Sequence, residues 1–357
     1  MPHPSEPGPR ELLLRTGFGY VASITLNVAI ELRIADLLGK GPRPIEELAR
    51  QSSADEDALY RALRLLASLG IFVEDPRRTF GNTPASELLR ARGDESLHDT
   101  IRWLSDPFHL RIYAELLHSV RTGEPCFDKL FGKPIFEYLP HDPRESEIFN
   151  SAMTNFSASL IPAVLDVYDF GGIGTLVDVG GGHGEILCSI LEKYPRMNGV
   201  LCDLAHVLDG AAEVIGRHGV GDRLRREPID FFEGVPAGGD AYILKHIIHD
   251  WDEARARTIL ENIATAIGDR PGRVLLIEMV LAPGNAPHLG KFLDIEMLAL
   301  PGGRERSEEE FRSLFASAGF DLARVIETES PVCVIEAVPS AARRARRPTA
   351  ASPTADR

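Results

Sequence analysis

The sequence predicts an α/β protein in which a mainly parallel sheet, closed by an antiparallel hairpin, follows a helical N-terminal domain. From Leu176 to Val280, short apolar runs that suit buried strands alternate with helical segments, a pattern typical of parallel sheets with right-handed crossovers. Two further runs, Leu322–Glu327 and Val332–Val338, are separated only by Thr328–Pro331, which is too short for a helix. They must therefore form an antiparallel hairpin at one end of the sheet.

Five short apolar runs are expected to form the parallel part of the sheet. They are Leu176–Val179, Val200–Cys202, Arg226–Ile229, Ala241–Leu244 and Val274–Val280. In open sheets of this kind, ligands bind at the carboxyl ends of the strands. Polar side chains that directly follow these runs are therefore the first candidates for a functional site.

The first hundred residues predict a winged helix, that is, three helices followed by a β-hairpin. Asp55 is expected to cap the third helix, because its side chain can accept a backbone N–H of the first turn. The expected elements are the helices Glu11–Leu38, Ile45–Ser52 and Glu56–Leu69, and the strands Ile71–Glu74 and Thr79–Asn82.

A winged helix of this kind leaves two interpretations open. Its third helix carries Arg61 and Arg64 and could enter a DNA groove as a recognition helix. That helix, however, opens with three consecutive acids from Asp55, and the formal net charge of the chain is −14, so both would repel phosphates. Apolar residues on more than one face of Glu11–Leu38 favour the other interpretation, a dimerisation module.

The stretch from Thr175 to Asp203 predicts a nucleotide-type cofactor site. It gives a strand, a glycine-rich turn, a helix and a second strand that ends in an acid. Glycines adopt positive φ and let a ligand approach the backbone, and Asp203 is placed to bind both hydroxyls of a ribose. Neither the dinucleotide pattern G-x-G-x-x-G nor the phosphate-loop pattern G-K-[ST] is present. The alternative is an ordinary tight turn between strand and helix.

The composition is that of a two-domain globular protein in a reducing compartment. Its 357 residues are 44% hydrophobic and 26% charged, which is the usual range for soluble domains. The four cysteines contain no C-x-x-C pair, which argues against a zinc site or a disulfide framework. No signal peptide is visible, and the apolar stretch Val21–Ile30 is too short to span a bilayer. A cytoplasmic protein is expected.

Two histidines follow the apolar strand that ends at Lys245. His246 and His249 thus lie where the chemistry of such a sheet is expected, and histidine is the natural base near neutral pH. A capping or core role is the alternative for each histidine, and the position after the strand favours a functional role for His249. Asp250, with Glu253, is expected to cap the following helix.

Two acids are candidate partners of these histidines. Glu278 is embedded in VLLIEMVL, where a charge is costly unless it has a partner, and a histidine would be a suitable one. Glu305 follows the Gly302–Gly303 turn, although a solvated turn acid is the alternative for this residue. No metal-binding cluster is expected.

Five motifs together resemble the plant-type small-molecule O-methyltransferases, the family of caffeate, isoflavone and acetylserotonin O-methyltransferases and of many bacterial pigment and antibiotic methyltransferases. The resemblance covers residues 12–338, about nine-tenths of the chain. It implies an all-helical winged-helix dimerisation domain, a class I Rossmann-like catalytic domain, S-adenosylmethionine as cofactor and a homodimer. The motifs are FNSAM at 149–153, LVDVGGGHG at 176–184, CDL at 202–204, LKHIIHDWDE at 244–253 and PGGRERSEEEF at 301–311.

The resemblance also implies the roles of individual residues. His249, in the H-D-W motif, would take the proton of the substrate hydroxyl, and Glu278 and Glu305 would flank and orient it. Asp250 and Met153 would lie near the substrate. The implied cofactor-binding residues are Gly180, Gly182, Asp203, Asp230, Phe231, Lys245 and Ser157.

The sequence thus predicts an enzyme that transfers the methyl group of S-adenosylmethionine to a hydroxyl of a small, phenolic or polyketide-like molecule, without a metal, nucleic acid or membrane. The expected domains are a dimerisation domain at residues 11–100, a catalytic domain with a helical lead-in at 101–338 and a disordered basic tail at 339–357. Two alternatives are a winged-helix DNA-binding regulator and a family member that binds the cofactor without methylating.

Overall fold

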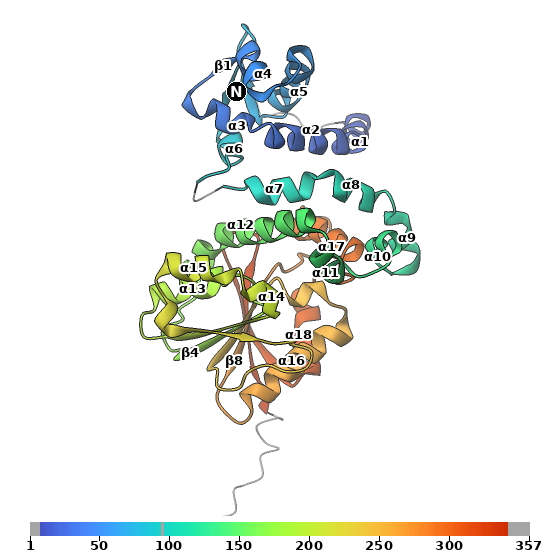
Figure 1. The fold of residues 1–357 in the computed structure, drawn as a ribbon. Helices are drawn as coiled ribbons and strands as arrows, with labels where there is room; N and C mark the ends of the chain where they lie inside the picture. The colour runs from blue at the N-terminus through green and yellow to red at the C-terminus, as the bar shows by residue number, and fades with distance from the viewer. Residues whose placement is uncertain (1–7, 94–95, 342–357) are drawn as a thin grey trace, which may run out of the picture. The chain divides into compact units, whose positions relative to one another are not determined.

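A computed structural model describes residues 8–93 and 96–341, which form two compact units (Figure 1). The first unit comprises residues 1–117 and 136–159, and the second comprises residues 118–135 and 160–357. This division differs from the predicted boundary at residue 100. The difference arises because the long helix α12 (Pro143–Val167) contributes its first two-thirds to the first unit.

The single helix predicted over Glu11–Leu38 is wrong, because the chain forms three helices there. They are α1 (Pro9–Gly17), α2 (Gly19–Glu31) and α3 (Ile34–Leu37). The first break falls at Phe18, between two glycines, which are poor helix formers. The second falls at Arg33, whose φ of 57° is left-handed and cannot continue a right-handed helix.

The rest of this region follows the predicted pattern closely. The helices α4 (Ile45–Ser52) and α5 (Glu56–Ser68) are present, and Asp55 Oδ1 accepts the N–H of Ala58 at 2.9 Å, as a cap should. The hairpin strands β2 (Phe72–Glu74) and β3 (Thr79–Asn82) pair antiparallel. A short strand, β1 (Arg43–Pro44), joins them in the order β1-β3-β2, so this domain is not purely helical.

The core of this region is apolar and continuous. Ile34, Leu48, Leu63, Leu66 and Phe80 are fully buried within it and bring α3, α4, α5 and β3 together. Burying such side chains contributes roughly 1.5–3 kcal/mol each. Further helices follow it along the chain: α6 (Pro84–Glu87), α7 (His98–Ser105), α8 (Pro107–Tyr113), α9 (Leu116–Thr122), α10 (Cys126–Phe131) and α11 (Ile135–Tyr138).

Helix α12 contains the FNSAM motif at residues 149–153. It begins at Pro143, a residue suited to the first turn, and runs to Val167 as one helix with Pro162 inside it. Among the described residues it is long and apolar enough to cross a membrane, as α1 and α2 would be if that bent pair were one span. Length and composition give only weak support for a span, because buried core helices meet the same criteria.

The second unit contains the predicted parallel sheet. Its strand order is β6-β5-β4-β7-β8-β10-β9, in which the first five strands are parallel and β10 pairs antiparallel with both neighbours. The predicted hairpin at one end is therefore confirmed. The strands are β4 (Thr175–Val179), β5 (Asn198–Asp203), β6 (Leu224–Pro228), β7 (Ala241–Lys245), β8 (Arg273–Glu278), β9 (Phe320–Glu327) and β10 (Cys333–Pro339).

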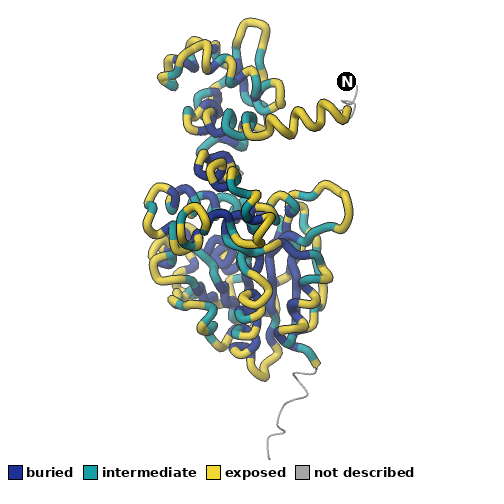
Figure 2. The backbone as a smooth tube through the Cα atoms, turned by 90° about the vertical axis from the view of Figure 1, so that its right-hand side faces the viewer, coloured by how far each residue is buried: buried dark blue, intermediate teal, exposed yellow. Residues whose placement is uncertain are grey.

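The strands of this sheet form the centre of the second unit, as the buried residues in Figure 2 show. Val177, Leu244, Leu276 and Ile335 are among the core residues that four neighbouring strands contribute. The strand β10 ends at Pro339, so this first residue of the predicted disordered tail is ordered; residues 342–357 lie outside the described part. The helices are α13 (Glu185–Lys193), α14 (Ala205–Leu208), α15 (Ala211–His218), α16 (Glu253–Ile267), α17 (Gly290–Ala299) and α18 (Glu308–Ser317).

The strand order fixes where a ligand can bind. The chain proceeds from β4 to β5 and β6 on one side and then returns to place β7 and β8 on the other side of β4. At this reversal the connections leave β4 and β7 in opposite directions and open a crevice at the carboxyl ends of these strands. Gly180 follows β4 and His246 follows β7, so both predicted site segments begin at this crevice.

Candidate active site

The turn after β4 has the backbone conformation that its glycines predicted. Gly180, Gly182 and Gly184 all have left-handed φ angles, of 71°, 58° and 86°. A Cβ atom on Gly180 would lie 2.6 Å from the side chain of Ile247, whereas one on Gly182 would meet nothing within 4 Å. The turn therefore packs tightly on one side and exposes its backbone to open space at Gly182, where a ligand can approach closely.

Two hydrogen bonds hold the side chain of Asp203, the acid at the end of β5, beside this turn. Its Oδ2 accepts the N–H of Gly182 at 2.8 Å, and its Oδ1 accepts the N–H of Leu204 at 2.7 Å. Burial raises the pKa of the Asp203 carboxyl, and these two N–H groups oppose the rise. Each carboxylate oxygen keeps a lone pair for a further donor, so the geometry suits two neighbouring hydroxyl groups of a ribose.

An aromatic cluster lies beside the same turn. The ring of Phe231 would be 3.5 Å from a Cβ on Gly180, and it packs edge-on against Phe232 and Trp251 with ring centroids 4.9 and 6.1 Å away. Such rings provide an apolar surface for a flat heterocycle. Asp230, the preceding residue, is exposed, and its carboxylate accepts the N–H of Phe232. The sequence analysis identified Phe231 and Asp230 but missed Phe232 and Trp251.

A buried acid near the end of β4, Asp178, interacts electrostatically with the half-buried Lys245 at the end of β7. Asp178, at 0% exposure, has no hydrogen-bond partner for either carboxylate oxygen among the described residues, and burial raises its pKa to about 7 although Lys245 opposes the rise. Burial likewise lowers the pKa of Lys245, and Asp178 opposes this. The two side chains therefore stabilise each other's charges at the ends of β4 and β7.

Met153 and Ser157 lie one turn apart on α12, as predicted, and the Ser157 hydroxyl donates to the carbonyl of Met153 at 2.6 Å. Both lie in the part of α12 that belongs to the first unit. Their roles toward substrate and cofactor therefore stay predictions.

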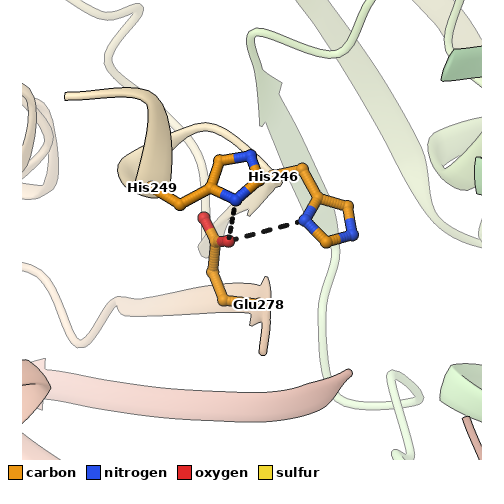
Figure 3. Close-up of side chains that lie close together, drawn as sticks. All are labelled: His246, His249 and Glu278. Carbon is orange, nitrogen blue, oxygen red and sulfur yellow. Dashed lines mark ion pairs between the residues drawn. The ribbon is translucent and has the colours of Figure 1, made fainter. Parts of the chain in front are cut away.

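His249 lies in a closely packed acidic pocket after β7. It is part of the short helix η4 (Ile248–Asp250), and its side chain is only 7% exposed. Its Nδ1 is 2.6 Å from Oε1 of Glu305 and 3.6 Å from Oε2 of Glu278, and Figure 3 shows Glu278 between the two histidines. Its Nε2 is 3.4 Å from Oδ1 of Asp250. The structure thus brings together the histidine and both acids that the sequence singled out.

Glu278 holds the backbone of this loop as well as facing the histidines. Its Oε1 accepts the N–H groups of Ile247 and Ile248 at 3.1 and 3.0 Å. The helix cap predicted for Asp250 is wrong, because Asp252 caps α16 by accepting the N–H of Arg255 at 2.8 Å. Asp250 instead lies within η4 and faces His249.

Two residues that the sequence analysis did not single out fix the position of His249. A Cβ atom on Gly303 would overlap the carbonyl oxygen of His249, and that oxygen also accepts the N–H of Arg304 at 2.8 Å. Arg306, at 0% exposure, donates to the carbonyl oxygens of Ile248 and Trp251 at 3.1 and 3.0 Å. The sequence showed the Gly302–Gly303 pair only as a turn, and nothing in it showed that Arg306 points inward.

The acids determine the charge of His249. Burial by itself lowers the pKa of His249, but the carboxylates of Glu278, Glu305 and Asp250 together raise it to about 10. Burial and the neighbouring acids in turn raise the pKa of Glu305. Burial also acts to raise the pKa of Glu278, but His249, His246 and Arg306 together outweigh burial and lower that pKa. Near neutral pH the pocket therefore holds an imidazolium between carboxylates.

The pKa of His246 is shifted in the opposite direction from that of His249. Burial lowers its pKa to about 4, so the ring is neutral near pH 7. Its φ of 52° is left-handed, an uncommon conformation for a residue with a side chain. Its Nδ1 lies 3.6 Å from Oε2 of Glu278, and its ring centroid is 4.9 Å from that of His249. No metal cluster was expected, yet His246, His249 and Glu278 each place a possible ligand atom within 4.8 Å of the others.

The comparison with known proteins decides between the remaining interpretations. A family model described as the O-methyltransferase domain matches residues 113–321, and one described as the O-methyltransferase dimerisation domain matches residues 14–92. The chain belongs to the O-methyltransferase family. It is an S-adenosylmethionine-dependent O-methyltransferase with an N-terminal dimerisation domain. The alternative of a DNA-binding regulator gains no support from α5, whose first turn carries Glu56 and Asp57.

Individual relatives resemble the chain over nearly its whole length. A phenazine O-methyltransferase, PhzM, from Lysobacter antibioticus is 41% identical over 328 residues, which cover 92% of this chain and 96% of the relative. The crystal structure of LaPhzM aligns with a TM-score of 0.86 at 40% identity, covering 94% and 100% of the two chains. CalO1, a methyltransferase in calicheamicin biosynthesis solved with S-adenosylhomocysteine bound, aligns with a TM-score of 0.83 at 31% identity and covers 92% and 97%.

The residues at the carboxyl end of β4 fit S-adenosylmethionine. The open space over Gly182 would accommodate a group pressed against the backbone, and Asp203 offers two acceptors for its ribose. Phe231 and its neighbouring rings would face the adenine. The remaining cofactor contacts assigned to individual residues, including Gly180 and Asp230, stay predictions.

Proposed function

We propose that this enzyme methylates a phenolic hydroxyl of a small polycyclic aromatic molecule and that His249 receives the proton of that hydroxyl. The main support for the proposal is the contact of 2.6 Å between His249 Nδ1 and Glu305. Because Nδ1 is bonded to this acid, Nε2 is the ring nitrogen that can accept a proton from the substrate. Glu278, 3.6 Å from the same Nδ1, stabilises the imidazolium that results.

The reaction requires little beyond positioning and a proton acceptor. S-adenosylmethionine supplies an electrophilic methyl carbon attached to a positively charged sulfur. The O–CH₃ bond forms as the S–CH₃ bond breaks, and the hydroxyl proton passes to Nε2 of His249. Arg306 holds η4 through hydrogen bonds to the carbonyl oxygens of Ile248 and Trp251, and Gly303 packs directly against the carbonyl oxygen of His249. These contacts keep the imidazole close to the acceptor oxygen.

The positive charge of His249 limits which hydroxyl groups the enzyme is expected to methylate. Because the pKa of His249 is raised to about 10, the free enzyme near pH 7 carries an imidazolium, which cannot take up another proton. A phenolate bound beside an imidazolium, however, has the same number of protons as a phenol beside a neutral histidine. We therefore expect acceptors whose hydroxyl is acidic enough to ionise near neutral pH, as on electron-poor aromatic rings. The phenazine O-methyltransferase relative is named for a ring of that kind.

A methyl-transfer assay with graded acceptors tests this proposal. The full-length enzyme would be given S-adenosylmethionine with a labelled methyl group and a panel of hydroxylated naphthalenes, anthraquinones and phenazines that spans several units of phenol pKa. At pH 7 we expect O-methylated products, with kcat/KM highest for the more acidic phenols. Methylation only at nitrogen or carbon, or no dependence on phenol pKa, would contradict the proposal.

We also propose that the functional unit is an obligate homodimer formed through residues 11–100. Helices α1 and α2 expose Leu12, Leu13, Leu14, Phe18 and Tyr20, each more than half exposed in the single chain. So much apolar surface on one segment is typical of an interface. Sedimentation at micromolar concentration should show a dimer. A stable monomer with full activity would rule out an obligate dimer.

A cytoplasmic location is part of the same proposal. The four cysteines, all within the described residues, form no disulfide, and three of them are buried. Burial raises the pKa of Cys188 to about 12, so this thiol stays protonated and unreactive. Thiol chemistry of this kind suits a reducing compartment. Fractionation of the producing cells would test the location directly.

A further inference from the structure

The pocket around His249 contains more potential metal ligands than methyl transfer requires. His246 and His249 both direct Nδ1 toward Oε2 of Glu278, and each nitrogen lies 3.6 Å from that oxygen (Figure 3). Oε2 of Glu278 accepts no hydrogen bond from any described residue, although the side chain is 0% exposed. Oε2 of Glu305, a second buried oxygen, likewise accepts none.

The spacing of these atoms is close to that of a zinc site. Zinc binds histidine nitrogen and carboxylate oxygen at about 2.0–2.2 Å with tetrahedral geometry, which places the ligand atoms about 3.3–3.6 Å from one another. Nδ1 of each histidine is already 3.6 Å from Oε2 of Glu278, and the three residues each place a possible ligand atom within 4.8 Å of the others, so one distance between ligand atoms must shorten. Rotation of one imidazole ring would close that distance.

The backbone supports the same arrangement. His246 takes up a left-handed φ of 52°, and its N–H is fixed by the carbonyl of Ile277 at 3.1 Å. Strained residues of this kind concentrate at functional sites, where the strain aims a side chain. The proton transfer to His249 does not use His246, so that reaction does not account for this strained and nearly buried imidazole.

We propose that His246, His249 and Glu278 form a binding site for a transition-metal ion such as Zn²⁺, with Glu305 supplying a fourth ligand through Oε2. This inference goes beyond the proposed function, in which no metal takes part. The ion would carry two positive charges into a pocket with two carboxylates, so its charge would be compensated. Neutral imidazole and carboxylate are ligands that zinc prefers, so zinc would release the Nδ1 proton of the His249 imidazolium as it binds.

An ion in this site would inhibit methyl transfer, a consequence that rests on the proposed role of His249. With the metal on Nδ1, the ring keeps its one proton on Nε2, the nitrogen that would otherwise accept the substrate proton. The ion would also displace the contact between Nδ1 of His249 and Oε1 of Glu305. Zinc would then act as a reversible inhibitor, relieved by a chelator.

Calorimetric titration of the full-length enzyme with Zn²⁺ tests the site, and Co²⁺ serves as a spectroscopic probe of nitrogen and oxygen ligands. His246→Asn is the decisive variant, because asparagine tolerates the left-handed backbone and removes the imidazole. We expect it to weaken Zn²⁺ binding at least about tenfold, since even outer partners of a metal site typically contribute that much. If the variant fails to fold, His246→Gly takes its place, because glycine also adopts this φ.

Two control variants identify other sources of binding. His218→Ala removes a histidine that lies between Glu192 and Glu185, at 2.7 and 3.2 Å, but whose nitrogens and acids are already paired with each other and with Arg217. Cys333→Ser removes the cysteine with a partly exposed side chain. Both variants should bind Zn²⁺ as the wild type does. Loss of binding in Cys333→Ser, or unchanged binding in His246→Asn, would overturn the proposed site.

Kinetics separate this inference from the proposed function. Zn²⁺ should inhibit the wild-type enzyme, and the inhibition should be at least about tenfold weaker in His246→Asn. Equal inhibition of both proteins would overturn the proposal. Zinc that binds the wild type, loses affinity in His246→Asn and yet leaves methyl transfer undiminished would support the metal site and count against His249 as the proton acceptor.

Discussion

The glycine turn after β4 and the pocket around His249 are the two halves of the candidate active site, and they are built in different ways. The turn is contiguous in the chain, and its key groups are backbone atoms: Gly182 has open space where a Cβ would lie, and Asp203 is held by the N–H groups of Gly182 and Leu204. The His249 pocket is made of side chains from three segments, with Glu278 on β8 and Glu305 in the loop before α18. One half depends on local conformation and the other on tertiary packing.

This contrast predicts that substitutions in the two halves impair different functions. A substitution in the glycine-turn half should weaken the cofactor and leave proton transfer intact. One in the His249 pocket should do the reverse, provided that the loop keeps its shape. Four substitutions, taken from the largest expected effect to the smallest, test this separation.

Replacing the proton acceptor should have the largest effect on turnover. General-base assistance typically contributes about 10²–10⁴-fold, so His249→Ala should lower kcat by that factor on a weakly acidic hydroxyl. The affinity for S-adenosylhomocysteine, measured by calorimetry, should be nearly unchanged. The defect should shrink with more acidic acceptors, since a hydroxyl that is already ionised needs no base.

Two further variants serve as controls for this experiment. His218→Ala, at a remote histidine paired with Glu192, should keep full activity. His246→Ala should lose much less activity than His249→Ala, because no proton passes through it in the proposed reaction. If His249→Ala retained most activity on a weakly acidic phenol, catalysis would depend on proximity alone, and the role given to His249 would be wrong.

Asp203→Ala tests the other half of the site. Hydrogen bonds to charged groups are worth roughly 1.5–3 kcal/mol each, and the two bonds to the ribose partly share one desolvation penalty, so losing both acceptors should cost about 2–4 kcal/mol. This corresponds to a roughly 30- to 800-fold weaker Kd for S-adenosylhomocysteine. At saturating cofactor, kcat should change far less than in His249→Ala. An unchanged Kd in a folded variant would remove Asp203 from the cofactor site.

The sequence predicted the glycine half almost completely because its information is local. A strand, three glycines with positive φ and an acid at the next strand end are separated by fewer than thirty residues. The parallel strands and the terminal hairpin also followed from apolar runs and short connections, whereas the order of the strands in the sheet was not predicted. The break at Phe18 was missed, because the apolar residues on both sides of it continue with helical spacing.

For the His249 half, the sequence pointed to the main residues but not to the contacts that hold them in place. The H-D-W motif and the two acids pointed to His249, Glu278 and Glu305, yet neither the left-handed backbone of His246 nor the inward Arg306 leaves a local signal. An arginine beside Glu305 is usually exposed, and only the folded loop shows that its guanidinium meets the carbonyl oxygens of Ile248 and Trp251. Contacts between segments fifty residues apart cannot be deduced from either segment alone.

Gly303→Ala tests how strictly the fold positions His249. A methyl group there would overlap the carbonyl oxygen of His249 and push η4 away from the loop before α18. Displacements of about 1 Å near reacting groups can cost roughly 10²-fold in rate, so kcat should fall by about that factor while cofactor binding persists. Gly216→Ala, where an added Cβ meets nothing within 4 Å, is the matched control and should be neutral. Equal activity of the two variants would show that the loop adjusts freely.

Glu305→Gln should have the smallest effect at neutral pH and the clearest effect on pH dependence. Burial lowers the pKa of His249, and the three carboxylates raise it to about 10, so removing the charge of Glu305 should lower that pKa. In the wild type, kcat/KM for a weakly acidic phenol should rise with pH as His249 loses its proton near pH 10. In the variant, this rise should begin at lower pH, with kcat near pH 7 changed by no more than about tenfold.

The pH dependence of thermal stability tests the same role of Glu305, and the direction of the expected change follows from the raised pKa of His249. The folded pKa of His249, about 10, lies above its ordinary value of 6.5, so the folded protein holds an extra proton between these values. The stability that His249 contributes is therefore fully present below pH 6.5 and is lost as pH rises through about 10. Melting curves should show a smaller loss of Tm from pH 7 to 10 in Glu305→Gln than in the wild type or in Glu309→Gln, a change at an exposed acid. An identical pH dependence in all three proteins would mean that Glu305 does not hold the proton on His249.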